Sequence, residues 1–103
     1  MANICQNTLY LTTRDKTLRD SVKKLIEETF TCNDSKSIDG EVFECKIKFD
    51  SRWIFPYKEM EELSKKFAEG NDLHIHVISY EFGCEYVGFN IYAYGEWRDK
   101  FAG

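Results

Sequence analysis

The chain lacks three features that would each point to a function class. No two of its four cysteines have C-x-x-C spacing, its net charge is −4 and not positive, and no apolar run approaches the roughly 20 residues of a membrane span. The first residues also lack the basic start and apolar core of a secretion signal. We therefore expect a cytoplasmic protein with reduced, buried thiols and no membrane contact. The acidic balance argues against a protein that binds nucleic acid mainly by neutralising phosphates.

The length and composition favour a single domain. Of the 103 residues, 43% are hydrophobic and 16% are aromatic, which is enough to form one core. No internal repeat or low-complexity segment divides the chain. We expect one compact domain that covers residues 1–103.

The spacing of apolar residues predicts six elements. Alternation with a period of two indicates strands at 3–12, 43–50, 73–80 and 86–94. Helical spacing indicates helices at 15–29 and 55–69, with Pro56 in the first turn of the second helix and Gly70 as its C-cap. The small polar residues of 31–40 predict a connection, and 95–103 is expected to be a docked tail.

The order strand, helix, strand, helix, strand, strand predicts an α+β fold in two layers. We expect a mixed, mainly antiparallel sheet whose odd-numbered side chains face both helices. A loop of three residues in the last hairpin would place Ile78 opposite Tyr86 and His76 opposite Gly88. A loop of five residues would keep the same faces. Either loop leaves the even-numbered side chains on a face that no helix covers.

Three sequence markers resemble those of the YubB ferredoxin-like domain family, small proteins of plasmids, phages and integrated elements. The markers are Cys5-x-Asn7-x-Leu9-x-Leu11, then Phe49-Asp50-x-x-Trp53-x-x-Pro56, then Tyr80-Glu81-x-Gly83 followed by Gly88. The resemblance covers nearly the whole chain, although Ile54-Phe55 stands where a Ser-Pro pair is common. It implies a ferredoxin-like sandwich and an origin in a mobile genetic element, and it implies no particular activity.

The even-numbered face is the predicted binding surface, because few domains of this size would expose so many aromatic rings. Tyrosines are frequent in protein interfaces, and rings on a sheet also stack single-stranded bases. Cross-strand tyrosine pairs on a solvated face are the structural alternative. The predicted partner-binding residues on this face are Tyr10, His74, His76, Ile78, Tyr80, Tyr86, Tyr92 and Tyr94. Glu81 is predicted to contribute from an acidic edge that also contains Glu85, Glu96 and Asp99.

No catalytic, cofactor-binding or metal-binding residues are predicted. His74 and His76 point to the same face of a strand, as two metal ligands would, but no other ligand is placed near them at a recognisable spacing. Glu81 has no second carboxylate with a complementary role, so we interpret it as a turn residue. We therefore expect no enzyme activity and no cofactor.

The function expected from these observations is that of a small, non-enzymatic binding protein. The mobile-element resemblance suggests a host protein as the partner, such as a CRISPR effector nuclease or its ribonucleoprotein, or a restriction enzyme, that the protein would inhibit. The alternative is a module that binds single-stranded RNA or DNA on the same face. The acidic composition favours the protein partner over nucleic acid. The sequence leaves the oligomeric state open.

Overall fold

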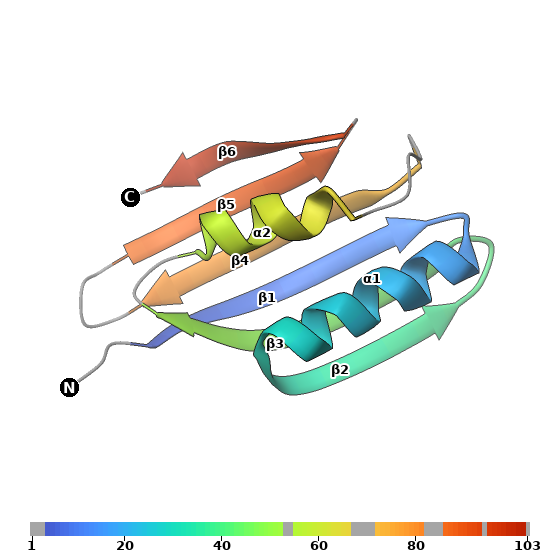
Figure 1. The fold of residues 1–103 in the computed structure, drawn as a ribbon, viewed down its shortest axis with the longest axis horizontal. Coiled ribbons are helices and arrows are strands. Elements are labelled where there is room, and N and C mark those ends of the chain that lie inside the picture. The colour runs from blue at the N-terminus through green and yellow to red at the C-terminus, as the bar shows by residue number, and fades with distance from the viewer. Residues whose placement is uncertain (1–3, 53–54, 67–71, 82–85, 94, 103) are drawn as a thin grey trace.

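The computed structural model describes residues 4–52, 55–66, 72–81, 86–93 and 95–102. Two helices lie on the same side of a six-stranded sheet, which confirms the expected α+β class (Figure 1). The elements in chain order are β1 (Ile4–Thr13), α1 (Lys16–Thr29), β2 (Thr31–Asp39), β3 (Phe43–Arg52), α2 (Tyr57–Ser64), β4 (His74–Glu81), β5 (Tyr86–Ala93) and β6 (Glu96–Ala102).

The sheet order is β2-β3-β1-β4-β5-β6, and every neighbouring pair is antiparallel. The predicted order of elements was therefore wrong in two places, and the sheet is not mixed. Residues 31–40 were expected to form a connection, but Thr31–Asp39 form the edge strand β2. The tail docks as expected, with Trp97 packed against the core, but it does so as the opposite edge strand β6. Both strands were missed because neither shows an alternation of apolar residues.

Helix α1 begins and ends almost where the sequence predicted. Its N-cap is Asp15, whose Oδ1 accepts a hydrogen bond of 3.2 Å from the Leu18 amide. Helix α2, which was predicted at 55–69, runs from Tyr57 to Ser64 in the described residues. Pro56 is its N-cap and does not lie within the first turn. The proposed C-cap Gly70 lies outside the described residues.

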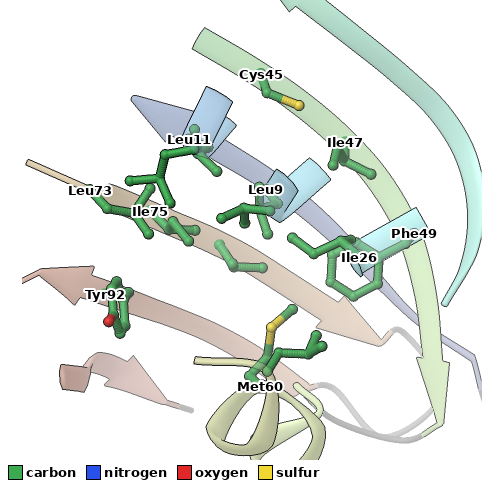
Figure 2. Close-up of a cluster of buried hydrophobic side chains, with 14 of the residues drawn as sticks. Leu9, Leu11, Ile26, Cys45, Ile47, Phe49, Met60, Leu73, Ile75 and Tyr92 are labelled. Carbon is green, nitrogen blue, oxygen red and sulfur yellow. The ribbon is translucent and has the colours of Figure 1, made fainter. Parts of the chain in front are cut away.

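The core lies between the sheet and the helices, and the odd-numbered side chains of β1, β3 and β4 line it as predicted. Leu9, Ile47 and Val77 are each completely buried, and Ile26 of α1 and Met60 of α2 pack against this layer. Figure 2 shows Leu9, Ile47, Ile26 and Met60 among the side chains that converge between the strands and the two helices. We call the helix-bearing side the covered face and the other side the open face.

Arg19 attaches the turn between β2 and β3 to helix α1. Its side chain is only 3% exposed and forms an ion pair with Asp39. The same guanidinium donates to the backbone carbonyls of Ile38 and Glu44, each at 3.4 Å, and lies over the Phe43 ring. The ion pair raises the pKa of Arg19 and lowers the pKa of Asp39. A polar contact therefore holds the edge strand that hydrophobic patterning does not explain.

Candidate functional site: the open face of the sheet

The register of the β4–β5 hairpin differs from the predicted one and decides which residues reach the open face. Ile78 lies opposite Phe89, and Glu81 lies opposite Tyr86. Four residues separate Glu81 from Tyr86, whereas the predicted loops had three or five. Because side chains alternate between faces, an even number of intervening residues reverses the faces of the second strand. The assignment of β5 was therefore wrong throughout.

Tyr86 and Tyr92 consequently lie on the covered face, and their predicted place on the open face was wrong. Tyr92 is only 7% exposed and its ring centroid lies 5.3 Å from that of Trp97. Tyr86 lies over Gly88, where an added Cβ would come within 2.9 Å of Tyr86 Cζ. Burial raises the pKa of both tyrosines. Both residues contribute to the core and are unavailable to a partner on the open face.

Two further predicted site residues do not contribute to the open face as described. Glu81 is 5% exposed and lies on the covered face as the last residue of β4, so its interpretation as a turn residue was wrong. Tyr94 lies outside the described residues. Glu81 is near enough to the buried thiol of Cys5 to contribute to the rise in the pKa of that thiol, which burial mainly causes.

The remaining five predicted residues are on the open face as expected. They come from the even-numbered positions of the central strands β1 and β4, and they are Tyr10, His74, His76, Ile78 and Tyr80. On β3, which lies between β1 and the edge strand β2, Lys46 and Lys48 share this face, as predicted.

An apolar patch occupies the open face where β4 meets β5, and most of it was missed from the sequence. We define the patch as Ile78, Val87, Phe89 and Ile91. Ile78 and Val87 are 44% and 43% exposed, and no described element covers this face. The alternation of β5 was visible in the sequence, but it was assigned to the opposite face. The observed register places Val87, Phe89 and Ile91, which were predicted to lie in the core, on the surface of the open face.

A row of rings crosses the same face beside the apolar patch. The Tyr10 and His76 centroids are 5.0 Å apart, and the His76 and Phe89 centroids are 5.9 Å apart. Lys46 Nζ lies 5.6 Å from the Tyr10 ring centre, within the range of a cation–π contact. Partial burial lowers the pKa of His76, which favours its neutral form near pH 7. At that pH the row is therefore aromatic and carries its positive charge at the lysine end.

Two hollows open on the β3–β1 half of the open face. The larger, of about 480 Å³, is bordered by polar groups that include Gln6, Thr8, Lys48 and Asp50. Tyr80 closes one side of it by donating a 2.7 Å hydrogen bond to Gln6. The smaller hollow, of about 250 Å³, is more apolar and is bordered by Ile38, Tyr10, His76 and Lys46 among others. Together they give this half of the face two depressions of different polarity.

A buried polar network joins residues of the first two sequence markers to Ser79, which directly precedes the third. Asn7, 1% exposed, donates to the Phe49 carbonyl at 3.2 Å and to Ser51 Oγ at 2.9 Å, and accepts from Ser79 Oγ at 2.6 Å. Ser79 stands directly before the Tyr80-Glu81 pair. The network joins β1, β3 and β4 on the covered face, so Asn7 has a structural role.

The described residues show no cluster suited to metal binding, and burial weakens the acidity of their thiols. They contain no group of three or more histidine, cysteine or acidic side chains that could hold a metal ion. The described thiols of Cys5, Cys32 and Cys45 are unbridged, and burial raises their pKa, to about 11 for Cys45. A raised pKa keeps a thiol protonated and unreactive. None of the helices in the described part of the chain combines the length and apolarity needed to cross a bilayer.

Comparisons with protein-family models, with curated proteins and with solved structures find no match to the chain. The resemblance to the YubB ferredoxin-like domain family therefore stays a prediction from the sequence. The argument for function accordingly depends on the open face itself.

Proposed function

We propose that this protein is a non-enzymatic binding domain that recognises another protein through the open face of its sheet. The observation that supports this most directly is the apolar patch, where Ile78 and Val87 are nearly half exposed beside Phe89 and Ile91. Contiguous apolar surface is characteristic of interaction sites in small domains. Thr8 of β1 lies opposite Ile78 and Arg98 of β6 lies opposite Ile91, so polar and charged groups border the patch on both sides, in the pattern of an apolar centre with a polar rim.

We also propose that the first six elements form a ferredoxin-like unit. The order β1-α1-β2-β3-α2-β4 is that of the split βαβ arrangement, and these strands occupy the adjacent positions β2-β3-β1-β4. In this proposal β5 and β6 extend the unit at the β4 edge. The apolar patch then lies across the junction between the unit and its extension.

The proposed partner is a host protein, and the proposed role is inhibition of a defence nuclease such as a CRISPR effector. This part of the proposal is supported only by the resemblance to proteins of mobile genetic elements. It includes an origin in such an element and a cytoplasmic location. The open face supplies the surface that an inhibitor acting by contact alone would need.

Capture from a nuclease-treated bacterial lysate tests the binding function. The tagged protein is compared with Ile78→Ser and Val87→Ser, and with Lys24→Gln on α1 as a control on the covered side. We expect each patch variant to weaken retention of the partner by about 1–3 kcal/mol, as anchor residues do, with the control unchanged. Retention that is the same in all four proteins would contradict the proposal.

The inhibitory role needs a separate test in cells. The protein is expressed in bacteria that carry a CRISPR effector nuclease and a plasmid with its target sequence. We expect survival of the plasmid with the wild-type protein and loss of the plasmid with Ile78→Ser. Plasmid loss with the wild-type protein, across effectors of different types, would remove the anti-defence role and leave the binding function to the lysate test.

Binding of single-stranded RNA or DNA is the second candidate function, and the ring row favours it. Tyr10, His76 and Phe89 could stack successive bases while Lys46 contacts the backbone. The aliphatic side chains of the patch argue for protein instead, because they offer no flat surface for stacking. A nucleic-acid site would lose affinity steeply with rising salt, whereas an apolar protein interface would lose little.

A further inference from the structure

Three lysines form a cluster on the open face that no ion pair neutralises. We define the lysine triad as Lys36 on β2 and Lys46 and Lys48 on β3. Lys36 and Lys46 are directly opposite each other across the two strands, an arrangement in which like charges destabilise a sheet. Within the described residues, none of the three lies within ion-pair distance of a carboxylate.

The acidic residues of this half of the face lie around the lysine triad. Glu44 and Asp50 are two positions from the nearest lysine along β3, and Asp34 lies opposite Lys48. Asp50 already accepts a hydrogen bond of 2.9 Å from Asn33. A carboxylate placed between Lys36 and Lys46, which lie directly opposite each other, would therefore have their two ammonium groups as its nearest charges. Screening over about 8–10 Å limits the effect of the more distant acidic residues of the chain.

The two hollows flank the triad and differ in the side chains they suit. Lys48 borders the larger, polar hollow, and Lys46 borders the smaller, apolar one. Thr8 of β1 lines the larger hollow and Thr12 of β1 lines the smaller one. The two threonines are four positions apart, which corresponds to about 13 Å at about 3.3 Å per residue. An extended chain that follows the boundary between β1 and β3 would present side chains to both hollows and pass Lys46 and Lys48 of the lysine triad.

We infer that the segment bound by the open face is an extended, acidic peptide segment of the partner protein. Its carboxylates lie on the lysine triad, and an apolar side chain enters the hollow bordered by Ile38 and Tyr10. This inference rests on the proposed function and adds to it the chemistry of the partner. A peptide fits better than a nucleic acid, because the apolar hollow and the aliphatic patch suit aliphatic side chains.

Two matched synthetic peptides test the inference. One alternates leucine with glutamate, the other alternates leucine with glutamine, and both carry a fluorescent label and flanking glycines. Single-stranded oligothymidylate is the third probe. Each is titrated by fluorescence anisotropy against the wild-type protein, Lys46→Gln, Ile78→Ser and the control Lys24→Gln. Circular dichroism establishes that each variant is folded.

We expect the glutamate peptide to bind about fivefold more tightly than the glutamine peptide, as two or three surface ion pairs would provide. Lys46→Gln should reduce this preference and Lys24→Gln should leave it unchanged. Raising the salt concentration should reduce it as well, because these ion pairs are exposed.

The outcomes separate the inference from the proposed function. Equal binding of both peptides, weakened in Ile78→Ser, would overturn the acidic segment and support the open face as a protein site. Binding of neither peptide would overturn the inference, and the lysate test would still decide the function. Tighter binding of oligothymidylate than of the glutamate peptide, lost in Lys46→Gln, would overturn the inference in favour of nucleic acid.

Discussion

At the scale of single residues, position on one or the other face of the sheet determines what each side chain does. Tyr92 and Ile91 are neighbours in β5, yet Tyr92 packs against Trp97 in the core and Ile91 belongs to the apolar patch. The faces predicted from the sequence had placed Ile91 in the core and Tyr92 on the open face. The same applies to the other residues of this strand, so one register determines both the core and the binding surface.

Replacing these two neighbours with alanine tests the register. We expect Tyr92→Ala to lower the free energy of unfolding by about 3 kcal/mol, because it removes a large buried ring. Ile91→Ala, which removes a partly exposed side chain, should cost about 1 kcal/mol or less. Urea unfolding measures both values. A larger loss for Ile91→Ala would mean that the described register is wrong.

Asn7 is the residue on which the buried polar network depends. Asn7→Ala would leave the Ser79 hydroxyl and the Phe49 carbonyl without their side-chain partner, so we expect a loss of about 2–4 kcal/mol. Gln6→Ala, on the same strand and exposed on the open face, should change stability by about 0.5 kcal/mol or less. Equal losses in the two variants, measured by chemical unfolding, would show that the network contributes no special stability.

At the scale of elements, the edge strand β2 depends on contacts that the pattern of its own sequence does not predict. Nearly all of its side chains are exposed, and its backbone pairs with β3 along almost its whole length. Arg19 attaches its far end to α1 through Asp39 and the Ile38 carbonyl. A strand of this kind forms because a neighbouring strand offers unpaired backbone groups.

Arg19→Ala should therefore destabilise the protein and loosen β2 selectively. The Ile38 and Glu44 carbonyls would lose their donor, which we expect to cost about 1–2 kcal/mol. Amide exchange in β2 should accelerate more than exchange in β4, which lies beyond β1 from the substitution. Arg19→Lys keeps the positive charge but lacks the planar guanidinium. Its free energy of unfolding should therefore lie between those of the wild type and Arg19→Ala. Uniform acceleration across the sheet would argue against a local attachment.

The elements with strong patterning could be predicted from the sequence, and the others could not. The alternation in β1, β3 and β4 and the spacing in α1 identified these elements and their buried sides. β2 and β6 were not predicted, because a strand at a sheet edge can pair through its backbone without an alternation of polar and apolar side chains. The faces of β5 depended on the number of residues between Glu81 and Tyr86, which alternation within each strand does not specify. Five of the nine predicted site residues therefore reached the open face, while Val87, Phe89 and Ile91 were missed.

At the scale of the whole molecule, the buried cysteine thiols and tyrosine hydroxyls link stability to pH. Burial raises the pKa of Cys45 from 9.0 to about 11 and raises those of Cys5, Tyr86 and Tyr92. A raised pKa in the folded state means that the unfolded chain loses its proton first as the pH increases. Stability is therefore complete below the unfolded pKa and falls as the pH rises through the folded pKa.

We expect the free energy of unfolding to decline as the pH rises above 9.0, the usual thiol pKa. Up to about 2 kcal/mol of the decline should come from Cys45, given its shift of pKa. Cys45→Ala should start from a lower stability at neutral pH and decline less between pH 9 and about 11. Urea unfolding over this range measures the difference between the slopes. Parallel declines in the two proteins would show that Cys45 does not contribute to the pH dependence.

Site-specific photo-crosslinking in bacterial cells tests most directly whether the open face is a protein-binding surface. A benzophenone side chain is placed at Val87 in the apolar patch, and at Lys24 on α1 in a matched control. We predict a discrete protein adduct from position 87, resistant to nuclease treatment and absent from position 24. Adducts from position 24 alone, or adducts at position 87 that nuclease removes, would contradict the assignment of the open face to a protein partner.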